Sequence, residues 1–70
     1  MPHRILSKRI YLEECLGVTA QHFDDLCVTS WTNEADHILL EIEPRKNAPP
    51  GTLDEFLNYV LAASLEARLS

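Results

Sequence analysis

The chain contains 70 residues, of which 46% are hydrophobic, and its formal net charge is −5 at pH 7. A chain of this length forms one small domain with a thin core, and its apolar content argues against a disordered tail. No apolar run reaches the roughly 18 residues of a membrane-spanning helix, and the opening MPHRILSKR lacks the apolar core of a signal peptide. We therefore expect a single-domain cytoplasmic protein.

Residues 4–11 (RILSKRIY) alternate partly between apolar and polar side chains, which predicts a first strand. Arg4, Lys8 and Arg9 supply half of the 6 Lys and Arg residues of the chain, so this strand forms either a weak electropositive patch or a solvated edge. We favour the solvated edge, because natural edge strands commonly carry charge.

Residues 12–27 (LEECLGVTAQHFDDLC) have the apolar spacing of one amphipathic helix. With 3.6 residues per turn, one set of side chains falls within an arc of roughly 120°, the width of a core-facing stripe. Gly17 lies on the opposite, solvent-facing side, where it costs about 1 kcal/mol relative to alanine but disturbs no packing. The members of the predicted core-facing stripe are Leu12, Cys15, Leu16, Thr19, Phe23, Leu26 and Cys27.

The same stretch has an alternative interpretation as a helix-turn-helix, with Gly17 in the turn and Thr19 capping the second helix. That second helix would present Gln21, Asp24 and Asp25 to DNA, and a phosphate backbone repels carboxylates. DNA affinity depends on Lys and Arg that neutralise phosphates, whereas this chain is acidic. We therefore keep nucleic-acid binding only as the alternative function.

Cys15 and Cys27 are predicted to be buried free thiols, because neither belongs to a C-x-x-C motif and both lie on the apolar side of the predicted helix. Their predicted separation along the helix is also too large for a disulfide. His22 neighbours Cys15 at helical spacing, but no cation lies nearby in the sequence to activate a thiolate nucleophile. We expect no catalytic residue and no enzymatic activity.

Metal and cofactor sites are not predicted either. His22 with Asp25, and His37 with Glu34, lack the spacing of a recognised metal site. The chain has only 2 glycines, and neither belongs to a phosphate-binding loop.

Residues 27–32 (CVTSWT) and 37–43 (HILLEIE) are predicted to form a hairpin, joined by the polar turn 33–36 (NEAD). The second of these strands is the most apolar short run of the chain, so we place it at the centre of a sheet. Its two predicted faces are Ile38, Leu40 and Ile42 on one side, and Leu39, Glu41 and Glu43 on the other.

Pro44 is expected to end this strand, and residues 45–51 (RKNAPPG) to form a loop. Thr52 is predicted to cap a second helix, in a capping box with Glu55. Leu65 and Leu69 drift away from the buried face of this helix. The buried face is predicted to contain Leu53, Phe56, Leu57, Val60, Leu61, Ser64 and Ala67.

The predicted order of elements is βαββα, an α+β two-layer sandwich. The third strand inserts between the other two and runs antiparallel to the first, which gives a split β-α-β sheet with both helices on one face. The uncovered face is then expected to expose Leu39, together with Trp31 and Tyr11, and such an apolar patch commonly marks a protein–protein surface. The residues predicted to bind a protein partner or a second copy are Trp31, Leu39, Tyr11, Leu65 and Leu69.

Four short motifs resemble the small D protein family of the His-Xaa-Ser system and together extend from about residue 9 to residue 69. The motifs are Ile10-Tyr11-Leu12-Glu13, Ala20-x-x-Phe23-x-Asp25-x-Cys27-x-Thr29, Glu55-Phe56-Leu57-Asn58-x-x-Leu61 and Ala67-Arg68. The resemblance implies an accessory protein encoded with radical-chemistry enzymes that modify a His-Xaa-Ser repeat peptide. It implies no catalytic residues. The uncovered sheet face and the ridge formed by Leu65 and Leu69 lead us to expect a non-enzymatic, self-associating, partner-binding protein.

Overall fold

The computed structural model describes residues 3–69, which form three strands and two helices in the order βαββα. This order confirms the α+β class and the layout predicted from the sequence. The elements are β1 (His3–Ser7), α1 (Glu13–His22), β2 (Cys27–Asn33), β3 (His37–Pro44) and α2 (Thr52–Leu69).

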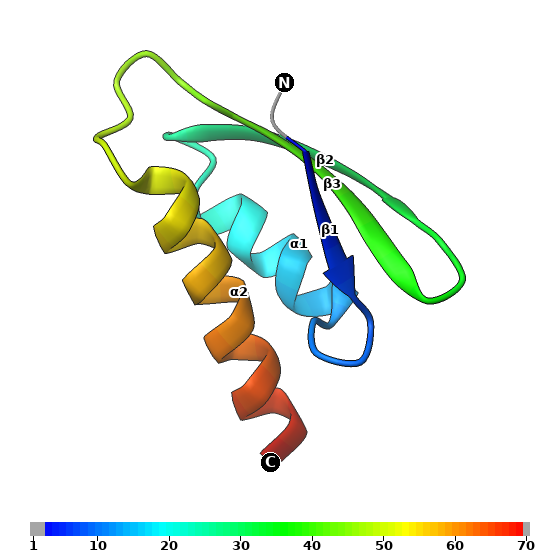
Figure 1. The fold of residues 1–70 in the computed structure, drawn as a ribbon. Coiled ribbons are helices and arrows are strands. Elements are labelled where there is room, and N and C mark those ends of the chain that lie inside the picture. The colour runs from blue at the N-terminus through cyan, green and yellow to red at the C-terminus, as the bar shows by residue number, and fades with distance from the viewer. Residues whose placement is uncertain (1–2, 70) are drawn as a thin grey trace.

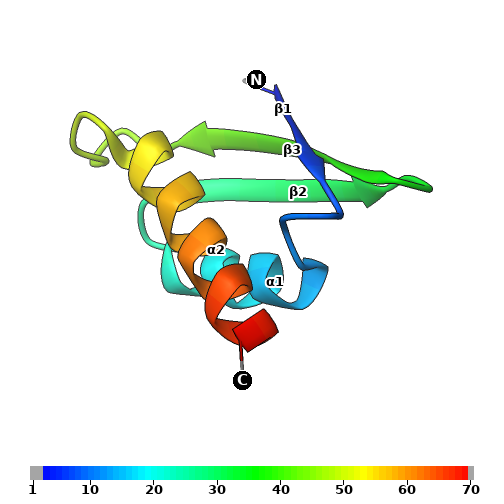
Figure 2. The ribbon, with the colours of Figure 1, turned by 60° about the horizontal axis from the view of Figure 1, so that its bottom comes forward.

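The strands form one sheet in the order β1-β3-β2, with β3 antiparallel to both neighbours. Leu6 of β1 lies opposite Ile38, and Thr29 of β2 lies opposite Ile42. Both helices lie against one face of the sheet (Figures 1 and 2). The predicted split sheet, with its first strand antiparallel to the central third strand, is therefore confirmed.

Alternation along β3 builds the core between the two layers. Ile38, Leu40 and Ile42 are fully buried on the face that the helices cover, whereas Leu39 is only half-buried on the other face. The remaining buried apolar residues come from β1, β2, both helices and the turn after α1. They are Leu6, Cys15, Leu16, Phe23, Cys27, Phe56 and Val60.

The helix predicted over residues 12–27 is real but shorter than expected. It passes through Gly17 without a break, so this segment contains no helix-turn-helix, and it ends at His22. Phe23 leaves the helix, and its carbonyl accepts hydrogen bonds from the N–H groups of Leu26 and Cys27. Cys27 then begins β2 opposite Pro44. The pairing of Cys27 with β3 takes the place of a continued helix here. The apolar spacing is the same in both cases, because Phe23 and Cys27 contact the same core.

The first strand also ends earlier than predicted, at Ser7 instead of residue 11. The carbonyl of Ser7 accepts hydrogen bonds from the N–H groups of both Ile10 and Tyr11, at 3.1 and 2.9 Å. These two bonds turn the chain back toward the helix layer. At the end of this turn, the N–H of Leu12 donates to the hydroxyl of the fully buried Ser64 at 3.0 Å, which ties the start of α1 to α2.

The start of α2 differs from the predicted capping box. Thr52 is the first residue of the helix, and its hydroxyl donates to the carbonyl of Pro49 at 2.6 Å. The N–H of Glu55 donates to the carbonyl of Gly51, whose φ of 85° requires a residue without a side chain. The buried face is also narrower than expected, because Ala67 is exposed and only Phe56 and Val60 of its apolar residues are fully buried.

Candidate protein-docking surface

The residues predicted to bind a partner belong to two predicted surfaces, the uncovered sheet face (Trp31, Leu39 and Tyr11) and a ridge of the second helix (Leu65 and Leu69). Trp31 was placed on the uncovered face of the sheet, and this placement is wrong. Trp31 lies opposite the buried Leu40, so it shares the face that the helices cover. Its indole N–H donates to a carboxylate oxygen of Glu13 at 3.2 Å, and the side-chain amide of Asn33 donates to the same oxygen.

Tyr11 was also placed on the uncovered face, and this prediction is wrong for a different reason. β1 ends before this residue, so Tyr11 belongs to the turn that leads into α1. Its side chain is half-buried and packs against the core. Leu65 and Leu69 lie exposed on α2, as predicted, with exposed fractions of 50% and 88%.

The uncovered face does hold Leu39, together with two residues that were not predicted. Ile5 lies directly opposite Leu39 in the neighbouring strand and is 72% exposed, the highest value for an apolar residue of the sheet. Val28, at the start of β2, is 44% exposed. The exposure of Ile5 could have been predicted from the alternation of side chains along a strand, because Ile5 precedes the buried Leu6 and must point to the opposite face.

The outer edge of β1 is open. The N–H of Lys8 donates to the carbonyl of Asp36 at 3.2 Å, which continues the β1–β3 ladder. Bonded and non-bonded pairs alternate in an antiparallel ladder, so Leu6 bonds to β3 whereas the N–H and C=O of Ile5 point away from it. Because β1 is an outer strand, no other strand within residues 3–69 pairs with these groups of Ile5.

A half-buried apolar flank of α2 lies on the same side of the molecule. At 100° per residue, Leu57, Leu61 and Arg68 share one flank of the helix. Arg68 reaches the turn after β1, where its guanidinium donates to the carbonyl of Lys8 at 3.1 Å. The opposite flank carries Tyr59, which stacks on His22 of α1 with ring centroids 4.7 Å apart. Leu57 and Leu61 therefore face the β1 side, and both are half-buried.

The two thiols are buried and not bonded to each other, as predicted. Burial raises the pKa of the Cys27 thiol, and the nearby Arg45 guanidinium opposes this shift without cancelling it. His22 stacks on Tyr59, and His37 bonds to Asp36 at 2.8 Å. Within residues 3–69, no group of three or more His, Cys, Asp or Glu residues is arranged to hold a metal ion.

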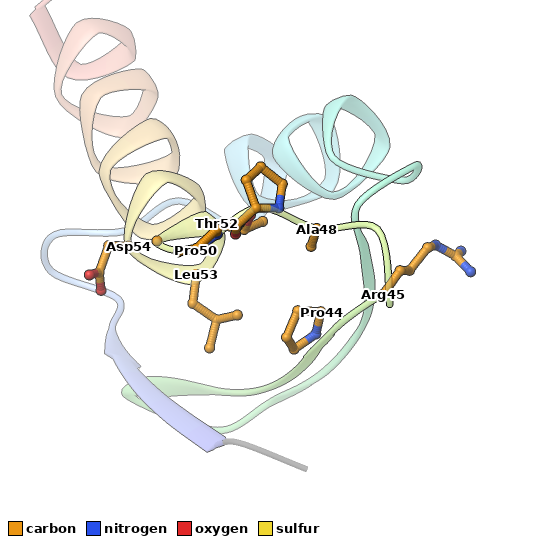
Figure 3. Close-up of a pocket in the computed structure, with 9 residues that line it drawn as sticks. Pro44, Arg45, Ala48, Pro50, Thr52, Leu53 and Asp54 are labelled. Atoms are coloured by element: carbon orange, nitrogen blue, oxygen red, sulfur yellow. Dashed lines mark hydrogen bonds between the residues drawn. The ribbon is translucent and has the colours of Figure 1, made fainter.

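The loop before α2 forms a hollow of about 430 Å³ (Figure 3). Leu53 and Pro44 face each other across it, and the rest of the lining is mostly proline-rich loop. Its charged residues are Asp54 and Arg45, and the Nε of Arg45 already donates to the carbonyl of Asp24 at 2.9 Å. This hollow offers no pair of groups suited to acid–base chemistry.

The comparisons with known proteins gave no match: no family model, no curated protein and no solved structure matches the chain. Neither helix within the described part of the chain combines the length and the apolar character needed to cross a membrane. The edge of β1, the uncovered sheet face and the Leu57/Leu61 flank of α2 are the features on which a function can be argued.

Proposed function

We propose that the protein is a non-catalytic, cytoplasmic binding module that docks an extended segment of a partner protein as an added strand on β1. The observation that carries this proposal is the open edge of β1, where the N–H and C=O of Ile5 point away from the sheet. In β-strand addition, such main-chain groups supply affinity, and pockets for alternate side chains supply specificity.

Apolar side chains are available on both sides of the strand that would be added. Ile5 and Leu39 lie above the edge, on the uncovered face of the sheet. Leu57 and Leu61 lie below it, on the flank of α2 that faces the β1 side. An extended segment alternates its side chains between two faces, so a segment with apolar residues in both directions fits this edge.

Area favours strand addition over docking of a flat surface onto the sheet. Three strands spaced ~4.8 Å apart and about 17 Å long form a face of roughly 250 Å². A standard protein interface buries about 800 Å² on each partner. The uncovered face alone is therefore too small, whereas an added strand also uses backbone hydrogen bonds and the helix flank.

The resemblance to the small D proteins supports an accessory role in a radical-enzyme system that matures His-Xaa-Ser peptides. In that role the bound segment would belong to the peptide or to one of its enzymes. Self-association remains a prediction of the sequence, and a second copy is the competing occupant of the edge.

An NMR titration tests the proposal with a peptide that has the sequence of residues 37–43, because that strand already pairs with β1. We expect the amide signal of Ile5 to shift on binding. Ile5→Pro should weaken binding at least tenfold, because proline removes the outward N–H while leaving the bonds of Leu6 to β3 intact. Ile5→Val keeps the N–H and is the matched control.

Unchanged amide signals of β1 at saturating peptide would contradict the proposal, provided that circular dichroism shows the protein to be folded. Light scattering on the free protein tests the competing occupant. A stable dimer that dissociates in the Ile5→Pro variant would assign the edge to a second copy and overturn the docking of a partner segment.

A further inference from the structure

The cations of this acidic protein are distributed unevenly. Its net charge is −5, yet four of its 6 Lys and Arg residues lie at β1 or at the turn that follows it. The one ion pair within residues 3–69 joins Asp36 to His37. Within the described part of the chain, no carboxylate forms a salt bridge with the cations at this edge, although the carboxylate of Asp36 interacts electrostatically with Lys8. The cations are Arg4, Lys8, Arg9 and Arg68, which we call the basic edge.

The fold brings this group together from both ends of the chain. Arg4 lies on β1, and its guanidinium donates to the carbonyl of His3 at 2.8 Å. The backbone N–H of Arg9 donates to the hydroxyl of Ser7, which holds Arg9 at the end of the strand. Arg68 comes from the last turn of α2, and its guanidinium contacts the carbonyl of Lys8 across a separation of 60 residues.

The need to keep other strands from pairing with the edge of β1 explains only part of the basic edge. Charges on an edge strand commonly prevent unwanted pairing, and Arg4, Lys8 and Arg9 belong to β1 or its turn. Arg68 belongs to a helix, and it adds a third positive charge beside Lys8 and Arg9. A negatively charged side chain that docks beside these cations gains favourable electrostatic energy.

We infer that the segment docked at β1 is acidic, with Asp or Glu side chains that meet the basic edge and apolar residues between them. This inference rests on the proposed function and names the chemistry of its partner. The strand on the other side of β1 also mixes carboxylate and apolar side chains: β3 places Glu41 opposite His3, at the start of β1, and apolar residues opposite Ile5 and Leu6.

Charge also disfavours a second β1 strand as the occupant. Two copies paired along this edge would bring two basic edges together, and like charges directly opposite each other destabilise strand pairs. The carboxylate of Asp36 is bonded to the Nδ1 of His37 at 2.8 Å and also interacts electrostatically with Lys8. The docked carboxylates are expected to lie toward the end of β1 where Lys8, Arg9 and Arg68 converge.

Three versions of one peptide test the inference. The first has the sequence of residues 37–43 (HILLEIE), the second replaces both glutamates by glutamine, and the third replaces both by lysine. At about 0.05 M salt we expect the glutamate peptide to bind about fivefold more tightly than the glutamine peptide. At about 0.5 M salt, where the Debye length is roughly 4 Å, this difference should nearly disappear.

A matched pair of variants locates the effect. Arg9→Gln and Lys46→Gln each remove one exposed positive charge, but Lys46 lies in the loop before α2. We expect Arg9→Gln to weaken binding of the glutamate peptide two- to threefold and Lys46→Gln to leave it unchanged. Equal losses in the two variants would show an effect of net charge alone and would overturn the inference.

The remaining outcomes separate the two proposals. Equal affinity for the glutamate and glutamine peptides at low salt would overturn the acidic segment but leave strand addition in place. If no peptide shifts the amide of Ile5, both proposals are wrong. A single-stranded oligonucleotide that shifts the same amides at lower concentration than the glutamate peptide would replace the acidic segment by a nucleic acid.

Discussion

The two edges of this small sheet are built differently, although both belong to short strands that pair with β3. At the β2 edge, the side chains of Trp31 and Asn33 both donate to Glu13, which joins the strand to the start of α1. At the β1 edge, Ile5 is 72% exposed, and Arg4 of the same strand and Lys8 and Arg9 after it form no salt bridge. The comparison teaches that side chains of one outer strand are bonded to a helix, whereas the central side chain of the other outer strand remains accessible.

Truncation of Trp31 at the β2 edge and of Ile5 at the β1 edge should reveal the largest difference in stability between the two edges. We expect Trp31→Ala to lower the free energy of unfolding by about 2 kcal/mol, because it removes a large side chain that packs against the core and bonds to Glu13. Ile5→Ala should change it by less than about 0.5 kcal/mol, because Ile5 is mostly exposed. Urea unfolding followed by circular dichroism measures both values, and equal losses would contradict the comparison.

The tie between α1 and the β2 edge is expected to contribute less. Glu13→Ala should cost about 0.5–1 kcal/mol, because two side-chain donors lose their acceptor at a solvent-exposed site. Glu14→Ala is the matched control, since Glu14 is an exposed carboxylate in the same first turn. If the two variants lose the same stability, the carboxylates act only through the helix dipole and the tie has no role of its own.

The smallest expected effect concerns the buried start of β2. Because burial raises the pKa of the Cys27 thiol above its usual 9.0, the folded state keeps this proton at a pH where the unfolded state releases it. This contribution to stability is present below about pH 9 and is lost as the pH rises further. The fall in stability between about pH 8.5 and 10 should be less steep in Cys27→Ala than in the natural chain. Identical slopes in denaturant titrations would contradict this.

Periodicity was sufficient to predict the fold, because the alternation in HILLEIE identified the central strand and its buried face. It was not sufficient to place the end of α1. Phe23 and Cys27 contact the same core from a turn and from a strand, so the apolar spacing continues after the helix has ended. Local pattern alone does not contain the pairing of Cys27 with Pro44 that ends the helix.

The candidate surface was predicted only in part. Leu39, Leu65 and Leu69 are accessible to different degrees, whereas Trp31 lies on the covered face. Parity within the strand contained this signal, because Trp31 lies four residues after Cys27, which was predicted to be buried, and therefore shares its face. The basic edge depends on the contact of Arg68 with Lys8, a pair of residues far apart in sequence, and only the packing of α2 brings them together.

The hydroxyl of Ser64 offers a marker for distant relatives of this chain. Alanine would fill the same space in α2 and favour the helix more strongly, but it would leave the N–H of Leu12 without its acceptor. A search for relatives can therefore require a small hydroxyl residue at the position of Ser64 in the second helix, at the same sequence distance from the residue just before the first helix. This criterion is more specific than the apolar positions around it, which are interchangeable. Chains that share this spacing and little else are the ones worth comparing first.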